Sequence, residues 1–224
     1  MKNLIIIGVG GFAREVAWHS ADAINYGEEF RLKGFIDGDK KIDECFYEKL
    51  ELPLLGDVFS YQIADDDVFV CAVGDTKIRD KLTKIIKKRG GKFFNLIHKT
   101  AVIAPNIKLG EGVIIGPMAI VGSNAILGNH VLITDQARVG HDSVVGNCVT
   151  VISTVSGGCE IGERVFVGVG ANIAPRRKIG NDAFISAGSI VIKNVEPYVQ
   201  VLGNPALPYK IKGELINNET AGNK

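Results

Sequence analysis

The sequence predicts an α/β half-domain with a parallel sheet, followed by a parallel β-helix. Three observations predict this fold class. Aliphatic residues recur every six positions over nearly half of the 224 residues. Near the N-terminus a glycine turn joins an apolar run to a helical stretch, and further apolar runs alternate with helical sequence up to about residue 95. A fixed short period is the signature of a repeat architecture, and a period of six is typical of a β-helix.

The six-residue period begins at Ile97 and shifts once by two residues, after Val151. A helix repeats near 3.6 residues and a single strand alternates with a period of two, so neither explains this spacing. An ordinary β-sandwich, the main alternative, has irregular strand spacing. The aliphatic positions are Ile97, Ile103, Leu109, Ile115, Val121, Leu127, Ile133, Val139, Val145, Val151, and then Val155, Ile161, Val167, Ile173, Ile179, Ile185 and Val191.

Each hexad is expected to form a short strand and a corner, and three hexads are expected to form one triangular coil. The seventeen hexads therefore predict between five and six coils, each in contact only with its neighbours. The aliphatic residue should point inward and stack on its counterpart in the next coil. Glycine follows it in nine hexads, and we expect these glycines at the corners, where a small side chain or a positive φ is useful.

The first residues predict a strand, a glycine turn and a helix. Apolar residues 3–8 are followed by Gly8-Val9-Gly10-Gly11-Phe12-Ala13 and by helical sequence from Arg14 to about Ala23. The spacing fits G-x-G-x-x-A, in which the glycines let the backbone approach a phosphate and the helix N-terminus supplies partial positive charge. The structural alternative is a glycine turn that only packs the helix on the strand.

Later segments complete a small parallel sheet. Residues 32–36 predict a strand that ends at Asp37, a place where an acidic residue commonly binds a ribose or a base. Residues 68–73 predict a strand before Gly74-Asp75, a helix is expected over 77–89, and a fourth strand over 93–97. A full dinucleotide fold needs two mononucleotide halves. Only one half fits before the hexads, which favours a single nucleotide, as in a nucleotide-sugar, over NAD.

Charge and hydropathy exclude several classes of partner. The chain has 26 basic and 25 acidic residues, so we expect no nucleic acid bound mainly by charge. No apolar run reaches transmembrane length, so no membrane association is expected, and the opening apolar run is too short for a signal peptide. The four cysteines show no metal-binding spacing, which is typical of reduced thiols in a cytoplasmic protein.

Together, the two parts resemble the sugar O- and N-acyltransferase family of hexapeptide-repeat transferases. The resemblance covers about residues 2–210. It implies a left-handed β-helix, a handedness that periodicity does not determine and that opposes the usual right-handed crossover. The motifs that carry it are Gly-x-Gly-Gly-Phe, Phe35-Ile36-Asp37, Val73-Gly74-Asp75 with Ile78-Arg79, Asn95-Leu96-Ile97-His98 ahead of the hexads, and Gly203-Asn204-Pro205-Ala206 after them.

The resemblance also implies a division of the chain and a function. It implies a Rossmann-like nucleotide-sugar-binding domain over 1–95 and a left-handed β-helix acetyltransferase domain over 96–212. Residues 213–224 are polar without an apolar period, which predicts a disordered tail. The acetyl donor would be acetyl-CoA. The acceptor would be the 4-amino group of a nucleotide-linked 4-amino-4,6-dideoxy sugar in bacterial surface-glycan synthesis. The protein would assemble as a homotrimer with active sites between subunits. A sialic acid O-acetyltransferase and a non-catalytic β-helix scaffold are the alternatives.

His141 is the candidate base for this chemistry, because acyl transfer needs a group that accepts a proton. It lies two residues after the inward Val139, so its side chain should point outward at a corner. Ser123 one coil earlier and Gly157 one coil later are small, which leaves room beside the imidazole. The resemblance implies a catalytic pair with Asp142, which would accept the Nδ1–H and fix the tautomer. The alternative is an exposed corner histidine without a role.

The other three histidines differ from His141 in their positions. His19 lies in the first predicted helix and is expected to be structural, His98 lies at the domain junction and His130 at a hexad turn. Zinc sites of β-helix proteins need histidines on adjacent coils. One coil is about 18 residues, and none of the three other histidines lies near a position 18 residues before or after His141. No metal is therefore expected.

Matching to the family, residue by residue, assigns the binding residues. The matches for the nucleotide-sugar are Gly10, Gly11, Phe12, Asp37, Gly74 and Thr134, and those for acetyl-CoA are Thr150, Val169 and Ala187. Many relatives carry a histidine where this chain has Thr150. The basic run Arg176-Arg177-Lys178 either binds the CoA phosphates or forms a solvated turn.

Overall fold

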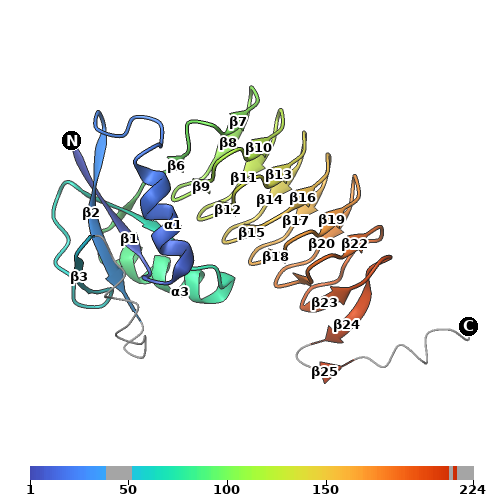
Figure 1. Cartoon of the computed structure of the whole chain (residues 1–224). Helices are drawn as coiled ribbons and strands as arrows, with labels where there is room; N and C mark the ends of the chain where they lie inside the picture. The colour runs from blue at the N-terminus through green and yellow to red at the C-terminus, as the bar shows by residue number, and fades with distance from the viewer. Residues whose placement is uncertain (39–51, 212–213, 216–224) are drawn as a thin grey trace, which may run out of the picture.

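The computed structural model describes residues 1–38, 52–211 and 214–215. Figure 1 shows a small α/β module at one end of the molecule and, beside it, a row of stacked triangular coils that leads away from the module. The predicted fold class, an α/β half-domain followed by a left-handed parallel β-helix, is confirmed. Within the described ranges, neither helix has the length and hydropathy needed to cross a bilayer.

The α/β module is built on a five-stranded parallel sheet in the order β3-β2-β1-β4-β5. Helix α1 packs on one face of this sheet, against Leu4 and Ile6, and helix α3 packs Leu82 and Ile86 on the other. The elements are β1 (Lys2–Ile7), α1 (Gly11–Ser20), β2 (Phe30–Asp37), β3 (Leu54–Asp57), β4 (Asp67–Cys71), α3 (Thr76–Lys88) and β5 (Lys92–Phe93). The sequence predicted all of these except β5, described below, and β3, which is only four residues long and has no alternating pattern.

The glycine turn after β1 takes the predicted form, but α1 begins at Gly11 instead of Arg14. Gly8 has φ +108°, and a β-carbon on it would lie 3.1 Å from Val73 Cγ2 and 3.3 Å from the Ala72 carbonyl oxygen. Both facts require glycine at this position. Gly10 is extended and directly precedes the helix. The turn therefore brings the N-terminus of α1 to the carboxyl edge of the sheet.

The single strand predicted over 93–97 is wrong, because two strands of different sheets lie there. Phe93, in β5, pairs with Phe69 of the module sheet, whereas Leu96, in β6, pairs with Ile114 of the β-helix. Asn95 lies between them. Its side chain donates to the Gly110 carbonyl at 2.9 Å and accepts from the Val113 N–H at 2.9 Å. These two bonds turn the chain out of one sheet and into the other.

The β-helix has three faces, each a parallel sheet with one short strand per coil. The domain face, whose first coils the α/β module covers, contains β6 (Leu96–Ile97), β9 (Ile114–Ile115), β12 (Leu132–Ile133), β15 (Thr150–Val151), β18 (Phe166–Val167) and β21 (Phe184–Ile185). The β13 face contains β7 (Val102–Ile103), β10 (Ile120–Val121), β13 (Arg138–Val139), β16 (Thr154–Val155), β19 (Asn172–Ile173) and β22 (Ile190–Val191). The β14 face contains β8 (Lys108–Leu109), β11 (Ile126–Leu127), β14 (Val144–Val145), β17 (Glu160–Ile161) and β20 (Lys178–Ile179).

The aliphatic row predicted to point inward does form the core of the β-helix. A second inward row lies two residues before it and was missed by the sequence analysis. Ala119, Ala125, Val131 and Ala137 belong to this row and are almost completely buried. Side chains two residues apart on an extended chain point to the same side, so each hexad contributes a large and, in most cases, a smaller inward residue.

The nine glycines that follow the aliphatic residues lie at the corners, but not because they need a positive φ. The positive φ values occur two residues later, for example at Asn124 (59°), His130 (57°) and Asp142 (56°). The glycines are needed because the next coil passes too close for a β-carbon. A β-carbon on Gly122, for instance, would overlap the backbone of His141 and lie 2.9 Å from the Gly140 carbonyl carbon.

The two-residue shift shortens the coil after His141. Val139 pairs with Val155, which is 16 residues later, whereas Val121 pairs with Val139, which is 18 residues later. The missing residues fall between β15 and β16, which is a different corner from that of His141. The corner that contains His141 therefore keeps its regular stacking.

The chain beyond the last hexad continues the domain face. Strand β23 (Val199–Leu202) pairs with β21, and β24 (Leu207–Ile211) pairs with β23 in the antiparallel direction. Of the segment 213–224, which was expected to be disordered, the structure describes only Glu214–Leu215, which form β25 and pair with β24. The rest of that segment lies outside the described residues.

Candidate active site

His141 and Asp142 lie at the corner between the β13 face and the β14 face. Since each coil is triangular, this corner is opposite the domain face. Backbone hydrogen bonds hold it between the neighbouring coils, from the Asp142 N–H to the Ser123 carbonyl at 2.9 Å and from the Gly158 N–H to the His141 carbonyl at 2.7 Å. The side chains of His141 and Asp142 are 65% and 57% exposed. The corner therefore presents both groups to solvent on a rigid backbone.

The side chains of His141 and Asp142 are hydrogen-bonded, although neighbours on a strand would point apart. His141 Nδ1 lies 2.7 Å from Asp142 Oδ2, and the left-handed backbone at Asp142 (φ 56°) makes this contact possible. Asn124, one coil earlier, donates to the second oxygen of Asp142 at 3.0 Å. The hydrogen bond from His141, followed by that from Asn124, lowers the pKa of the Asp142 carboxyl. An ionised Asp142 holds the proton on Nδ1 and leaves Nε2 free to accept one.

Gly157 makes room for the imidazole on the next coil. A β-carbon on Gly157 would overlap Nε2 of His141 and lie 2.7 Å from its Cε1 atom. The small residue expected at this position therefore accommodates the histidine ring itself. Asp142 in the same turn contacts Nδ1 of the imidazole, and Gly157 on the next coil lies under Nε2. These two residues therefore set the orientation of the ring.

Four of the residues assigned to the nucleotide-sugar lie in segments at the carboxyl ends of β1, β2 and β4. Gly10 directly precedes α1, Gly11 begins it, Asp37 ends β2, and Gly74 follows β4. A β-carbon on Gly10 or Gly74 would meet no atom within 4 Å, so the backbone is accessible there. Asp37 is 8% exposed and accepts a hydrogen bond from the Gly38 N–H at 2.8 Å. Adjacent carboxyl ends of parallel strands are where open α/β sheets bind ligands.

Phe12 and Thr134, also assigned to the nucleotide-sugar, line a small cavity between α1 and the β-helix. His19 and Asp135 line the same cavity, and their side chains approach to 3.3 Å between Nε2 and Oδ2. This contact connects α1 to the corner that follows β12, and the sequence analysis missed it. Phe12 packs partly against the core that the module shares with the domain face. The structure thus brings Phe12 and Thr134 together at the junction of the two parts.

The residues assigned to acetyl-CoA do not lie together. Val169 and Ala187 are exposed on consecutive coils, at the corner between the domain face and the β13 face, where the Gly188 N–H donates to the Val169 carbonyl at 2.9 Å. Thr150, by contrast, is 2% exposed. Its hydroxyl accepts from Arg79 Nη2 at 2.9 Å and contacts the Gly74 carbonyl at 3.2 Å. The Thr150 side chain is therefore bonded within the chain, where the α/β module covers this part of the domain face, and its contact with CoA stays a prediction.

Comparisons with known proteins agree with this arrangement. Residues 3–86 match the model of the PglD N-terminal domain family. The acetyltransferase domain of PglB from Neisseria gonorrhoeae FA1090, solved in complex with acetyl coenzyme A, is 25% identical with a TM-score of 0.81, over 92% of this chain and 98% of that chain. A histidine-to-asparagine mutant of perosamine N-acetyltransferase from Caulobacter crescentus was solved with CoA and GDP-perosamine. It is 30% identical to this chain with a TM-score of 0.80, and the match covers 96% of this chain and 98% of that chain.

This chain belongs to the sugar O- and N-acyltransferase family of hexapeptide-repeat transferases. Among curated proteins, it is 30% identical over 115 residues to UDP-N-acetylbacillosamine N-acetyltransferase of Bacillus subtilis (strain 168). That match covers 51% of each protein, so the chain spans about half the length of this relative.

Arg79 joins the two parts of this chain, whereas the sequence indicated it only as part of the Ile78-Arg79 motif. Its guanidinium is completely buried. The five N–H groups donate to five acceptors, namely the carbonyls of His130 (3.0 Å), Val73 (2.7 Å), Gly74 (3.2 Å) and Cys148 (2.7 Å) and the hydroxyl of Thr150 (2.9 Å). Arg79 thereby ties the Gly74 loop of the module to the turns that precede β12 and β15. Its place on the buried stripe of α3, with Leu82 and Ile86, is the sequence signal that would have identified it.

His98 and His130 have structural surroundings. His98 Nδ1 lies 2.8 Å from the Thr100 hydroxyl, and burial lowers the pKa of His98. His130 packs edge-on against Phe93 with 4.4 Å between ring centroids, and burial lowers its pKa to about 4. A histidine with that pKa is neutral at pH 7. His141 is thus the histidine whose surroundings suit proton transfer at an open surface.

Proposed function

We propose that this chain transfers an acetyl group from acetyl-CoA to the 4-amino group of a nucleotide-linked 4-amino-4,6-dideoxy sugar, in bacterial surface-glycan synthesis in the cytoplasm. The observation that carries the proposal is the exposed His141–Asp142 pair, with 2.7 Å between Nδ1 and Oδ2. The similar structures support it, since one holds acetyl coenzyme A and another CoA with GDP-perosamine. The name of the Bacillus subtilis relative, an N-acetyltransferase of a UDP-linked sugar, agrees.

In this proposal His141 acts as a general base. The amine nitrogen attacks the thioester carbonyl carbon, so that a C–N bond forms and the C–S bond breaks. Nε2 of His141 accepts the proton lost by the amine and returns it to the departing sulfur, which leaves as the free thiol of CoA. Asp142 stays ionised, keeps the Nδ1–H in place and stabilises the imidazolium that forms.

Release of free thiol from acetyl-CoA tests the proposed function directly. Purified protein should release thiol with 4-amino nucleotide-sugars and not with sialic acid, whose hydroxyl would be acetylated by the alternative enzyme. A thermal-shift panel of UDP, GDP, dTDP and CMP sugars would identify the nucleotide, because a ligand that binds the native state raises Tm. Thiol release with sialic acid alone would favour the O-acetyltransferase, and none with any acceptor would favour a non-catalytic scaffold.

Asp37→Ala should raise KM for the nucleotide-sugar by roughly 10–100-fold, the value of a hydrogen bond to a charged group. The effect on kcat should be much smaller, because Asp37 ends β2 in the α/β module whereas His141 lies across the β-helix. Steady-state kinetics with varied nucleotide-sugar measure both quantities. Asp65→Ala, which removes an exposed carboxylate from the same module, is the matched control and should have no effect. Tight binding of NADH by the wild type would contradict a single-nucleotide site.

We also propose a homotrimer with active sites between subunits. Within one chain, Gly10 and Gly74 lie at the carboxyl edge of the module sheet, on the side of the domain face. His141 occupies the corner opposite that face. A second copy would bring these groups together, and rotation about a three-fold axis closes such contacts into a ring. Exposed aliphatic side chains flank the His141 corner and suit such packing: Val102 and Ile120 on the β13 face, and Ile126 and Val144 on the β14 face.

Light scattering should therefore show a mass three times that of the 24.1 kDa chain. Replacing Ile126 and Val144 together by lysine should shift this mass toward the monomer, because charged side chains are costly to bury. A monomer mass for the wild type at micromolar concentration would contradict the trimer.

Gly157→Ala should lower kcat by roughly 10–100-fold, since small displacements of a catalytic group have effects of this size. The new methyl group would occupy the position of the His141 ring and force the imidazole to another rotamer. Ser123→Ala, on the other side of His141, is the control and should leave kcat nearly unchanged. Adding Gly157→Ala to His141→Ala should cause no further loss. A further loss in that background would show that Gly157 acts independently of the ring.

A further inference from the structure

The basic run Arg176–Lys178 lies at the same edge of the β-helix as His141. Asn124, Asp142, Gly158 and Arg176 occupy equivalent left-handed positions on four successive coils, with φ between 56° and 69°. Backbone hydrogen bonds connect these coils, and the last runs from the Arg176 N–H to the Gly157 carbonyl at 3.0 Å. Arg176 is thus two coils from Asp142 along this corner.

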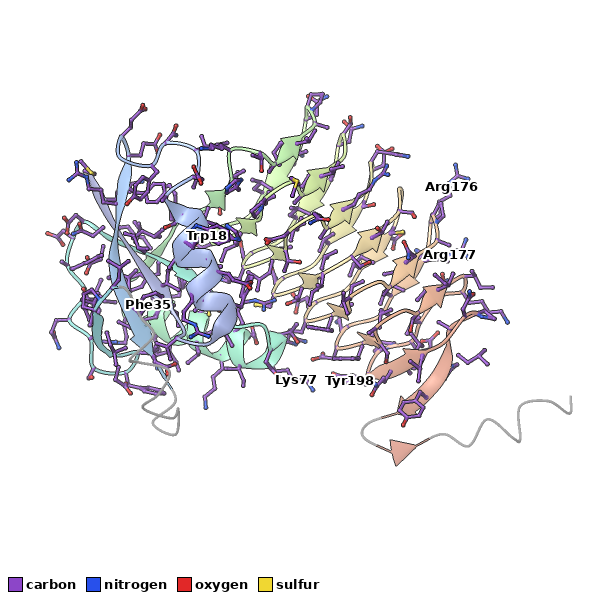
Figure 2. All side chains as sticks on the ribbon, in the orientation of Figure 1. Trp18, Phe35, Lys77, Arg176, Arg177 and Tyr198 are labelled. Carbon is purple, nitrogen blue, oxygen red and sulfur yellow. The ribbon has the colours of Figure 1, made fainter. Side chains whose placement is uncertain are left out.

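The three cations of the run have different surroundings. Arg177 donates to the carbonyls of Pro175 at 3.1 Å and Ile192 at 3.4 Å. Lys178 forms an ion pair with Glu160 at 2.9 Å. Arg176 is exposed and has no ion pair or side-chain hydrogen bond with any residue that the structure describes. Figure 2 shows Arg176 projecting from the outer edge of the distal coils, on the side away from Lys77 and Tyr198. Of the run, Arg176 is therefore the cation available to a ligand.

The corner between His141 and Arg176 is open. Gly157 and Gly158 occupy the intervening coil, and the first aliphatic carbons of Arg176 pass over Gly158, with Cγ 3.2 Å from the position of a β-carbon there. Neighbouring strands lie about 4.8 Å apart, so two coils separate the backbones of Asp142 and Arg176 by about 10 Å. In acetyl-CoA the extended pantetheine arm lies between the thioester and the phosphates. A cation that binds the phosphates must therefore be displaced from the base along the β-helix, as Arg176 is.

We propose that Arg176 binds a phosphate group of CoA, and that Arg177 and Lys178 do not. This inference rests on the proposed function, which makes acetyl-CoA the donor. Arginine suits the role because its planar guanidinium forms paired hydrogen bonds with phosphate oxygens. The pantetheine arm would then follow the glycine corner from Arg176 to the Nε2 side of His141.

Calorimetric titration of the full-length protein with CoA tests this inference. Arg176→Asn is the informative variant, because asparagine tolerates the left-handed backbone and should keep the wild-type Tm. It should weaken CoA binding roughly 10-fold, the value of one charge-assisted contact at an exposed site. Arg177→Gln and Lys178→Gln are the matched controls and should retain the wild-type Kd. The difference in CoA affinity between Arg176→Asn and the wild type should become smaller at high salt, because exposed charges are screened.

Truncated ligands separate the two kinds of phosphate. If Arg176→Asn also binds 3′-dephospho-CoA more weakly than the wild type does, Arg176 contacts the pyrophosphate. If the two proteins bind 3′-dephospho-CoA equally well, Arg176 contacts the 3′-phosphate. With S-acetylpantetheine, which has neither, kcat/KM of Arg176→Asn should equal that of the wild type. An unchanged Kd for CoA in Arg176→Asn, or equal losses in all three variants, would overturn this inference alone. Failure of the wild type to bind CoA would overturn the proposed function with it.

Discussion

His141→Ala is expected to lower kcat for acetyl transfer by roughly 10²–10⁴-fold, the usual contribution of a positioned acid–base group. The structure places the imidazole on a rigid corner, with Asp142 on Nδ1 and an open Nε2. Asp142→Asn should cost less, because an amide still occupies the site and the base remains. The expected order of activity is therefore wild type, then Asp142→Asn, then His141→Ala, measured as free thiol released from acetyl-CoA.

Both variants should fold normally. The two side chains are more than half exposed and do not belong to the stacked aliphatic core, so Tm and molecular mass should match those of the wild type. Near-normal turnover in a folded His141→Ala protein would falsify the base assignment. It would leave the positioning of donor and acceptor as the main source of the rate.

Arg79→Met should lower the free energy of unfolding by about 3–5 kcal/mol, because each buried acceptor that loses its donor costs about 1–3 kcal/mol. Methionine fills much of the volume of the arginine stem but donates no hydrogen bond. The carbonyls of His130, Cys148 and Val73 would then lose the partner that the structure shows. Arg79→Lys should also destabilise, because an ammonium cannot reach acceptors that are spread over a planar fork.

Denaturant and thermal unfolding at fixed protein concentration would measure the effect of Arg79. Lys81→Met, which removes an exposed cation from the same helix, is the control and should change stability by less than about 0.5 kcal/mol. Thr150→Val removes one of the five acceptors and should cost about 1 kcal/mol. If Arg79→Met were as stable as Lys81→Met, the buried guanidinium would not be what holds the module to the β-helix.

The core of this protein could be predicted because it depends on local periodicity. A residue six positions along the chain occupies the same place on the next face, so the row from Ile97 to Val191 identified the β-helix before any contact was known. The glycine turn at Gly8–Gly11 was predictable for a similar reason, since a strand and a helix so close in sequence can be joined in few ways. The outward direction of His141 followed from its place two residues after the inward Val139, whereas its pairing with Asp142 was implied only by the family resemblance.

The surroundings of residues that contact a neighbour distant in sequence could not be predicted from the sequence. Thr150 was expected on the CoA surface, but it faces Arg79, 71 residues earlier in the chain. Its exposure depends on which face of the β-helix the module covers, and the hexads do not encode that. The role of Gly157 in seating the His141 ring arises only when the shortened coil brings the two turns into register.

The sequence by itself determined the repeat, the inward aliphatic row, the outward direction of His141 and the order of strand, glycine turn and helix. All of these are properties of chain geometry within one or two coils. The tertiary structure decided which face the α/β module covers, which cation of the basic run stays unpaired, and why glycine recurs at the corners. The physical reason is packing, since burial, charge pairing and close backbone approach depend on residues that the chain brings together only after many coils have stacked.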